Sequence, residues 1–87
     1  MVSRKVMVKN ASGLHARPAG VLAQAAGKCR CDVTIHVGER DVKAKSILNI
    51  MAAAIKCGTE IEVCCDGENE EESLNQLCSL IEGGLGE

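Results

Sequence analysis

One short segment combines residue types that can handle a phosphoryl group: His15, Arg17 and Pro18 in the run SGLHARPA, residues 12 to 19. Apolar spacing predicts a helix from Ala16 to about Lys28. Pro18 then falls in the first helical turn, where its missing N–H costs no hydrogen bond. His15 directly precedes the helix. The backbone N–H groups of Ala16 and Arg17, together with the helix dipole, therefore favour an anion there.

The same arrangement favours a nucleophilic imidazole and its phosphorylated product. A nearby helix N-terminus disfavours the protonated ring, and the neutral ring keeps a lone pair for attack. The helix N–H groups and the Arg17 guanidinium can then bind the phosphoryl oxygens. The residues alone leave two readings equally open, an anion-handling site and an ordinary surface histidine. No second base, carboxylate pair or metal cluster stands beside His15, so a hydrolase site is not indicated.

Hydrophobic periodicity predicts seven elements that would position this segment. Each strand has one apolar face that needs a cover, which predicts an α+β layer with helices on one face of an antiparallel or mixed sheet. Gly38 and Glu39 fit a two-residue hairpin turn. The expected order is a strand over 2–8, a helix over 16–28, strands over 32–37 and 40–43, a helix over 47–55, a strand over 60–65 and a helix after residue 69.

The last helix has the clearest signals for its two ends. Asn69 is its expected N-cap, with Glu72 completing a capping box. An apolar stripe at helical spacing runs from residue 74 to Leu85, and Gly83 is expected to end the helix.

Ser46 is the second candidate site. It is expected to be the N-cap of the short helix that follows it, and a phosphate there would also be favoured by the helix N-terminus. The apolar residues Ile47, Leu48 and Met51 form either a partner surface or part of the core. The pattern alone favours core for most of this run, and the three residues are kept as the candidate partner surface.

Length and charge narrow the functional classes. The chain has 87 residues and a net charge of −2, which predicts a single domain over 1–87 and argues against direct nucleic-acid binding. All Lys and Arg precede residue 57, and the segment from Glu60 onward is acidic. The start of the chain lacks a long apolar run, so we expect a cytoplasmic protein without membrane insertion.

Six cysteines and no aromatic residue make the composition unusual. A disulfide framework would need a secretory context, which the sequence does not indicate. The sequence also contains no Cys-x-x-Cys pair of the kind that binds zinc. Cysteine as a small apolar filler is favoured over a metal or redox role. His36 alternates onto a polar strand face and is given no role. No metal and no cofactor are expected.

The run SGLHARPA resembles the active-site motif of HPr, the histidine phosphocarrier family of the bacterial sugar phosphotransferase system. The segment KAKSILNIM around Ser46 and the strand GTEIEV at residues 58 to 63 resemble the family too, so the likeness spans the chain. It implies an open-faced β-sandwich, in which three helices cover one face of a four-stranded antiparallel sheet in the order βαββαβα.

The resemblance also implies a function. His15 would take a phosphoryl group on Nδ1 from phospho-enzyme I and donate it to IIA domains of sugar permeases, with Arg17 assisting. Such a chain is a carrier with a phosphohistidine intermediate and without independent small-molecule turnover. Ser46 matches the serine that an ATP-dependent kinase modifies in low-GC Gram-positive relatives. The phosphorylated form there serves as corepressor for a catabolite-control transcription factor. A monomer is expected.

Three alternatives stay open. A regulatory module would act mainly through phospho-Ser46, and the family includes a regulatory paralogue without the histidine that is present here as His15. A nitrogen-branch phosphocarrier would use the same chemistry with other partners. A cysteine-based metal or redox protein is the third. Asn49 stands where relatives often have Gly, which bears on the regulatory surface more than on the carrier site.

Overall fold

The computed structural model describes residues 1–85 and orders them as the periodicity predicts. The first three strands and the first helix have nearly the predicted bounds, while the second helix is shorter and the fourth strand longer. The elements are β1 (Val2–Met7), α1 (Ala16–Gly27), β2 (Cys31–Val37), β3 (Arg40–Lys43), α2 (Ile47–Ala52), β4 (Glu60–Gly67) and α3 (Glu70–Glu82).

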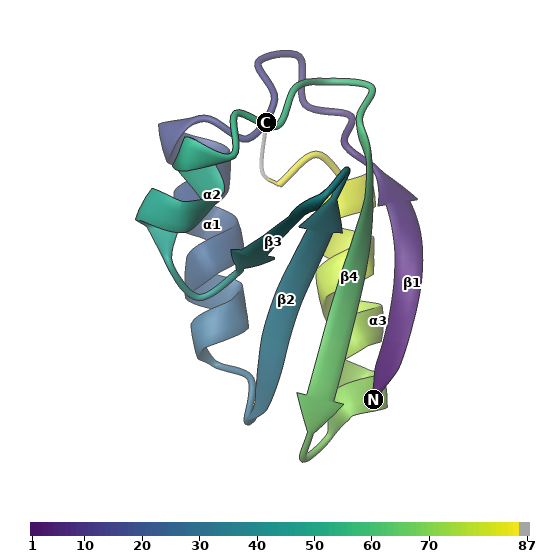
Figure 1. Cartoon of the computed structure of the whole chain (residues 1–87). Coiled ribbons are helices and arrows are strands. Elements are labelled where there is room, and N and C mark those ends of the chain that lie inside the picture. The colour runs from purple at the N-terminus through teal and green to yellow at the C-terminus, as the bar shows by residue number, and fades with distance from the viewer. Residues whose placement is uncertain (86–87) are drawn as a thin grey trace.

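The four strands form one antiparallel sheet in the order β1-β4-β2-β3. Ile35 of β2 lies opposite Val63 of β4 and Val42 of β3, and all three side chains are buried on the same face. The helices lie on one side of this sheet (Figure 1). The predicted fold class, an open-faced sandwich of a four-stranded antiparallel sheet and three helices, is confirmed.

The core lies between the sheet and the helices and consists of aliphatic and cysteine side chains. Alternate strand residues supply one side, and the apolar stripes of α1 and α3 supply the other, as expected for half-buried elements. The largest fully buried side chains include Leu22, Ile35, Ile50, Ile61, Leu77, Ile81 and Leu85. Leu85 belongs to this core although α3 ends before it, because a left-handed backbone (φ 53°) turns it inward.

The cysteines are packed as small apolar residues. All six lie within the described residues and are free thiols. Cys31, Cys65 and Cys78 are in the core, and burial, followed by the neighbouring thiol of Cys31, raises the pKa of Cys65 to about 12. Cys64 follows the opposite face of β4 from Cys65, on the open side of the sheet, yet is only 7% exposed. Cys29 precedes β2 and is only partly buried, so it does not share a strand face with Cys31.

Two turn predictions have opposite outcomes. The hairpin at Gly38 and Glu39 is confirmed, since Val37 pairs with Arg40 around it. The capping box of α3 is wrong. Asn69 has a left-handed backbone (φ 58°, ψ 32°), which is outside the extended region that a capping side chain needs, and its side chain makes no cap hydrogen bond.

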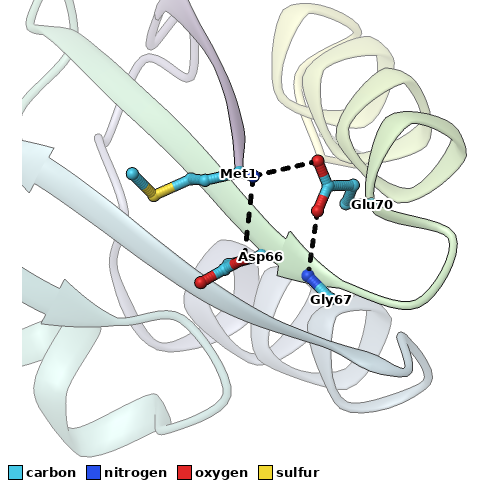
Figure 2. Close-up of polar contacts among 4 residues, drawn as sticks. All are labelled: Met1, Asp66, Gly67 and Glu70. Carbon is cyan, nitrogen blue, oxygen red and sulfur yellow. Dashed lines mark hydrogen bonds and ion pairs between the residues drawn. The ribbon is translucent and has the colours of Figure 1, made fainter.

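Glu70 holds the start of α3 instead. Its carboxylate accepts a hydrogen bond from the Gly67 N–H at 3.1 Å and pairs with the Met1 ammonium at 3.1 Å, as Figure 2 shows. Asp66 lies 3.7 Å from the same ammonium. These contacts connect β1, the end of β4 and α3. The Gly67 hydrogen bond is the main cause of the lowered pKa of Glu70.

Candidate functional site

His15 is the N-cap residue of α1, as the sequence predicts. Its backbone is extended (φ −77°, ψ −167°), and its carbonyl accepts the Ala19 N–H at 2.7 Å. The imidazole is exposed, and no hydrogen bond or ion pair among residues 1–85 uses it. The helix begins at Ala16, so the N–H groups of Ala16 and Arg17 have no acceptor within it. An incoming anion would therefore meet N–H donors that have no acceptor within the helix, beside an imidazole that has no partner in the described part of the chain.

The loop before His15 is fixed by its neighbours on both sides. Leu14 is 2% exposed, and its N–H donates to the Ile55 carbonyl at 2.9 Å. Gly13 has φ +70°, and a Cβ there would lie 2.4 Å from the Ile55 oxygen. Only glycine fits this approach without strain. The loop that follows α2 therefore sets where the His15 backbone lies.

Asn10 connects the same loop to the opposite end of the chain. It is 2% exposed, and its Nδ2 donates to the Gly84 carbonyl at 2.6 Å, while its own carbonyl accepts the Gly13 N–H at 2.9 Å. The loop before α1, the loop after α2 and the turn after α3 lie at one end of the sheet (Figure 1). The residue type of Asn10 suits a turn, but nothing in the sequence indicates that its side chain binds a segment 74 residues away.

A hollow of about 390 Å³ opens beside the imidazole. It joins the His15 loop to the end of α2 and the loop beyond it. Ala54 on its wall has a left-handed backbone (φ 51°), which costs a non-glycine residue energy and is often kept at functional sites. The lining residues are Ser12, Leu14, His15, Met51, Ala54, Ile55 and Lys56. Lys56 and Ala54 carry no sequence signal that points to this site.

Arg17 does not line the hollow beside His15. It lines a second, shallower depression between α1 and α2, together with Gly20, Val21, Lys45 and Ile47. No hydrogen bond or ion pair among the described residues uses the Arg17 side chain, so it is free to meet an anion. The structure thus joins the start of α1 to the start of α2, two segments that are far apart in the sequence.

Ser46 is the N-cap of α2, as predicted. Its Oγ accepts the Asn49 N–H at 3.3 Å, and its carbonyl accepts the Ile50 N–H at 3.1 Å. At the other end of the helix, Arg40 donates from Nη1 to the Ala52 carbonyl at 3.2 Å. This six-residue helix ends at Ala52, before the expected Ile55.

Three of the four apolar residues between Ser46 and Ala52 do not belong to the core. Ile47, Leu48 and Met51 are 45%, 79% and 40% exposed, while Ile50 on the opposite side of α2 is buried. The preference for core in this run is wrong, because α2 lies at the surface and packs inward only through the side that carries Ile50. We call Ile47, Leu48 and Met51 the α2 patch. Met51 also lines the hollow beside His15.

Other candidates for chemistry are weaker. Within residues 1–85, no group of three or more His, Cys, Asp or Glu side chains is placed to hold a metal ion. His36 faces Asp41 across β2 and β3, and its Nδ1 forms a hydrogen bond with the Asp41 carboxylate. None of the described helices is long and apolar enough to cross a membrane.

The sheet, the three helices and a His-Ala-Arg-Pro helix start define the class of small histidine phosphocarrier domains. A family model described as "PTS HPr component phosphorylation site" matches residues 2–83. The chain belongs to the HPr family of the phosphotransferase system.

Individual relatives agree with this assignment. Phosphocarrier protein HPr of Mycoplasma capricolum is 40% identical over 77 residues, covering 88% of this chain and 86% of that protein. HPr-like protein Crh of Bacillus subtilis is 38% identical over 82 residues, covering 94% and 96%. A crystal structure of HPr from Thermoanaerobacter tengcongensis has a TM-score of 0.95 at 36% identity, covering 100% of this chain and 98% of that one.

Proposed function

We propose that this chain carries a phosphoryl group on His15, accepting it from phospho-enzyme I and donating it to sugar-specific IIA domains. The observation that supports it is the exposed imidazole at the start of α1, which has no hydrogen-bond partner among residues 1–85 and lies beside backbone N–H groups that have no acceptor within the helix. On uptake the Nδ1 lone pair attacks phosphorus while the bond from phosphorus to the donor breaks. On donation a nucleophile of the acceptor attacks phosphorus while the bond from phosphorus to Nδ1 breaks, which returns the neutral imidazole.

The surroundings of His15 suit both halves of this exchange. A phosphoryl group brings close to two negative charges, which the N–H groups of Ala16 and Arg17 and the Arg17 guanidinium can balance. The buried Leu14 and the close approach of Gly13 to Ile55 hold the loop still. A fixed site loses little entropy when the phosphoryl donor docks.

The α2 patch is proposed as the surface that these partners bind, because it is exposed, apolar and adjacent to His15 through Met51. Phosphorylation of Ser46 by a protein kinase would place a dianion at the edge of this patch. The new charge would oppose docking of enzyme I, while the phosphate could still accept the Asn49 N–H. We place the reaction in the cytoplasm and propose that the monomer is the active form.

A regulatory module is the second candidate, and the likeness to Crh supports it. Crh of Bacillus subtilis, a catabolite repression protein, forms a dimer with a swapped domain in its crystal structure, and that chain is 37% identical to this one with a TM-score of 0.77. This candidate acts through phospho-Ser46 and contact with a catabolite-control transcription factor. It predicts phosphorylation of Ser46 without transfer through His15.

One experiment separates the two candidates. The intact mass is measured after incubation with phosphoenolpyruvate and enzyme I, for the wild type, His15→Ala and Ser46→Ala. A gain of one phosphoryl group that acid removes, absent only from His15→Ala, is the expected result. If the wild type gains nothing while the same enzyme I labels another carrier, the carrier function is refuted and the regulatory module becomes the better proposal.

A further inference from the structure

Lys56 lies beside His15 although the two are far apart in sequence. Both line the hollow at the end of α2. The backbone of Lys56 is held close to the His15 loop, since a Cβ on Gly13 would come within 2.9 Å of the Lys56 Cα. The Thr59 N–H donates to the Lys56 carbonyl at 3.1 Å and closes the turn. The backbone from which the Lys56 side chain extends is therefore held in place.

The ammonium of Lys56 has no partner among residues 1–85. The side chain is exposed, and no ion pair or hydrogen bond of residues 1–85 uses it. The acidic groups of residues 1–85 that pair with a basic group do so away from Lys56: Asp66, Glu68 and Glu70 at the end of β4 and the start of α3, and Asp41 on β3.

The two cations approach His15 from different elements. Arg17 extends from α1 into the depression on one side, and Lys56 comes from the loop after α2 on the hollow side. A lysine is a compact charge on a flexible stem, so it can follow a phosphoryl group that moves between donor and acceptor.

We propose that Lys56 is a second cationic contact for the phosphoryl group on His15, acting from the hollow side while Arg17 acts from α1. The inference rests on the proposed carrier function, because it needs a phosphoryl group on the imidazole. Lys56 makes or breaks no covalent bond. It stabilises the dianionic form of the phosphoryl group over the monoanion, because a positive charge beside His15 interacts more favourably with two negative charges than with one.

The test follows the phosphoryl group itself. Wild type, Lys56→Gln, Lys56→Arg and Lys28→Gln are loaded on His15 with phosphoramidate, a small donor that needs no protein contact, and titrated by phosphorus-31 NMR. Lys28→Gln removes the same charge just beyond the far end of α1, about 18 Å away for a 12-residue helix. Loss of a contact at about 6 Å in water should raise the phosphoryl pKa by roughly 0.3–0.5 units.

We expect this rise in Lys56→Gln only, with Lys56→Arg close to the wild type and Lys28→Gln unchanged. Equal pKa values in Lys56→Gln and Lys28→Gln would overturn the inference, and so would a wild type that phosphoramidate cannot load. Thermal melting of each variant verifies that it is folded. A wild type loaded by phosphoramidate but not by enzyme I would refute the proposed function while leaving the Lys56 result to be judged separately.

Discussion

Gly13→Ala should weaken the His15 loop strongly. A non-glycine residue at φ +70° pays about 1 kcal/mol for the left-handed backbone. Its Cβ would lie 2.4 Å from the Ile55 oxygen and 2.9 Å from the Lys56 Cα, and both are backbone atoms that cannot rotate away. The loops must therefore separate, which breaks the hydrogen bond from Leu14 to Ile55, worth about another 1 kcal/mol.

The expected loss is about 2 kcal/mol of unfolding free energy, a large part of the roughly 5 kcal/mol typical of a small domain. Urea unfolding followed by circular dichroism measures it. For a domain with a urea slope of about 1 kcal/mol per molar, the midpoint should fall by about 2 M. Phosphoryl uptake at His15 should fall as well, even below the transition, because the loop no longer holds the imidazole in place.

Gly20→Ala is the matched control. Gly20 is in the middle of α1 with nothing within 4 Å of an added Cβ, so the substitution should raise stability by about 0.5–1 kcal/mol. If Gly13→Ala is as stable as the wild type, or shifts in the same direction as Gly20→Ala, the docking of the two loops does not have the role assigned to it.

Three other perturbations follow from single contacts. Ser46→Ala should cost about 1 kcal/mol in urea unfolding because the Asn49 N–H loses its cap, and Ser46→Asp should restore it; equal losses would refute the cap. Glu70 has a folded pKa below its ordinary 4.5, so its stabilising contribution is present above pH 4.5 and is lost as the pH falls through the folded pKa. Glu70→Gln should therefore flatten the acid dependence of stability below pH 4.5, and an unchanged slope would contradict this. Alkylation near pH 8, followed by mass spectrometry, should label the exposed Cys57 long before Cys65, whose pKa is raised to about 12; similar rates would contradict the packing.

Much of the fold follows from local sequence pattern. Strand alternation and helical spacing depend only on which neighbours share a face, so the order of elements was predictable. The helix start at Ala16, the Ser46 cap and the Gly38 turn also depend on a few adjacent residues. The segment SGLHARPA carries its chemistry locally, because His15 and the donors beside it are consecutive.

Predictions from neighbouring residues were wrong where the same residue types fit more than one local structure. Asn69 followed by Glu72 has the residue types of a capping box, but the turn from β4 gives Asn69 a left-handed backbone, and Glu70 takes the contact instead. The run after Ser46 is apolar at core spacing, yet a short helix at the side of the sheet exposes the α2 patch. Periodicity reports which residues share a face and cannot report what covers that face.

The sequence by itself determined the elements, the fold class and the reactive histidine at a helix start. Only the tertiary structure decided which distant residues surround that histidine. Gly13 docks on Ile55, Asn10 holds Gly84, and Lys56 shares a hollow with His15, all through contacts between segments at least 40 residues apart. Such contacts depend on how the sheet brings its loops to one end, and no spacing within a single element encodes that placement.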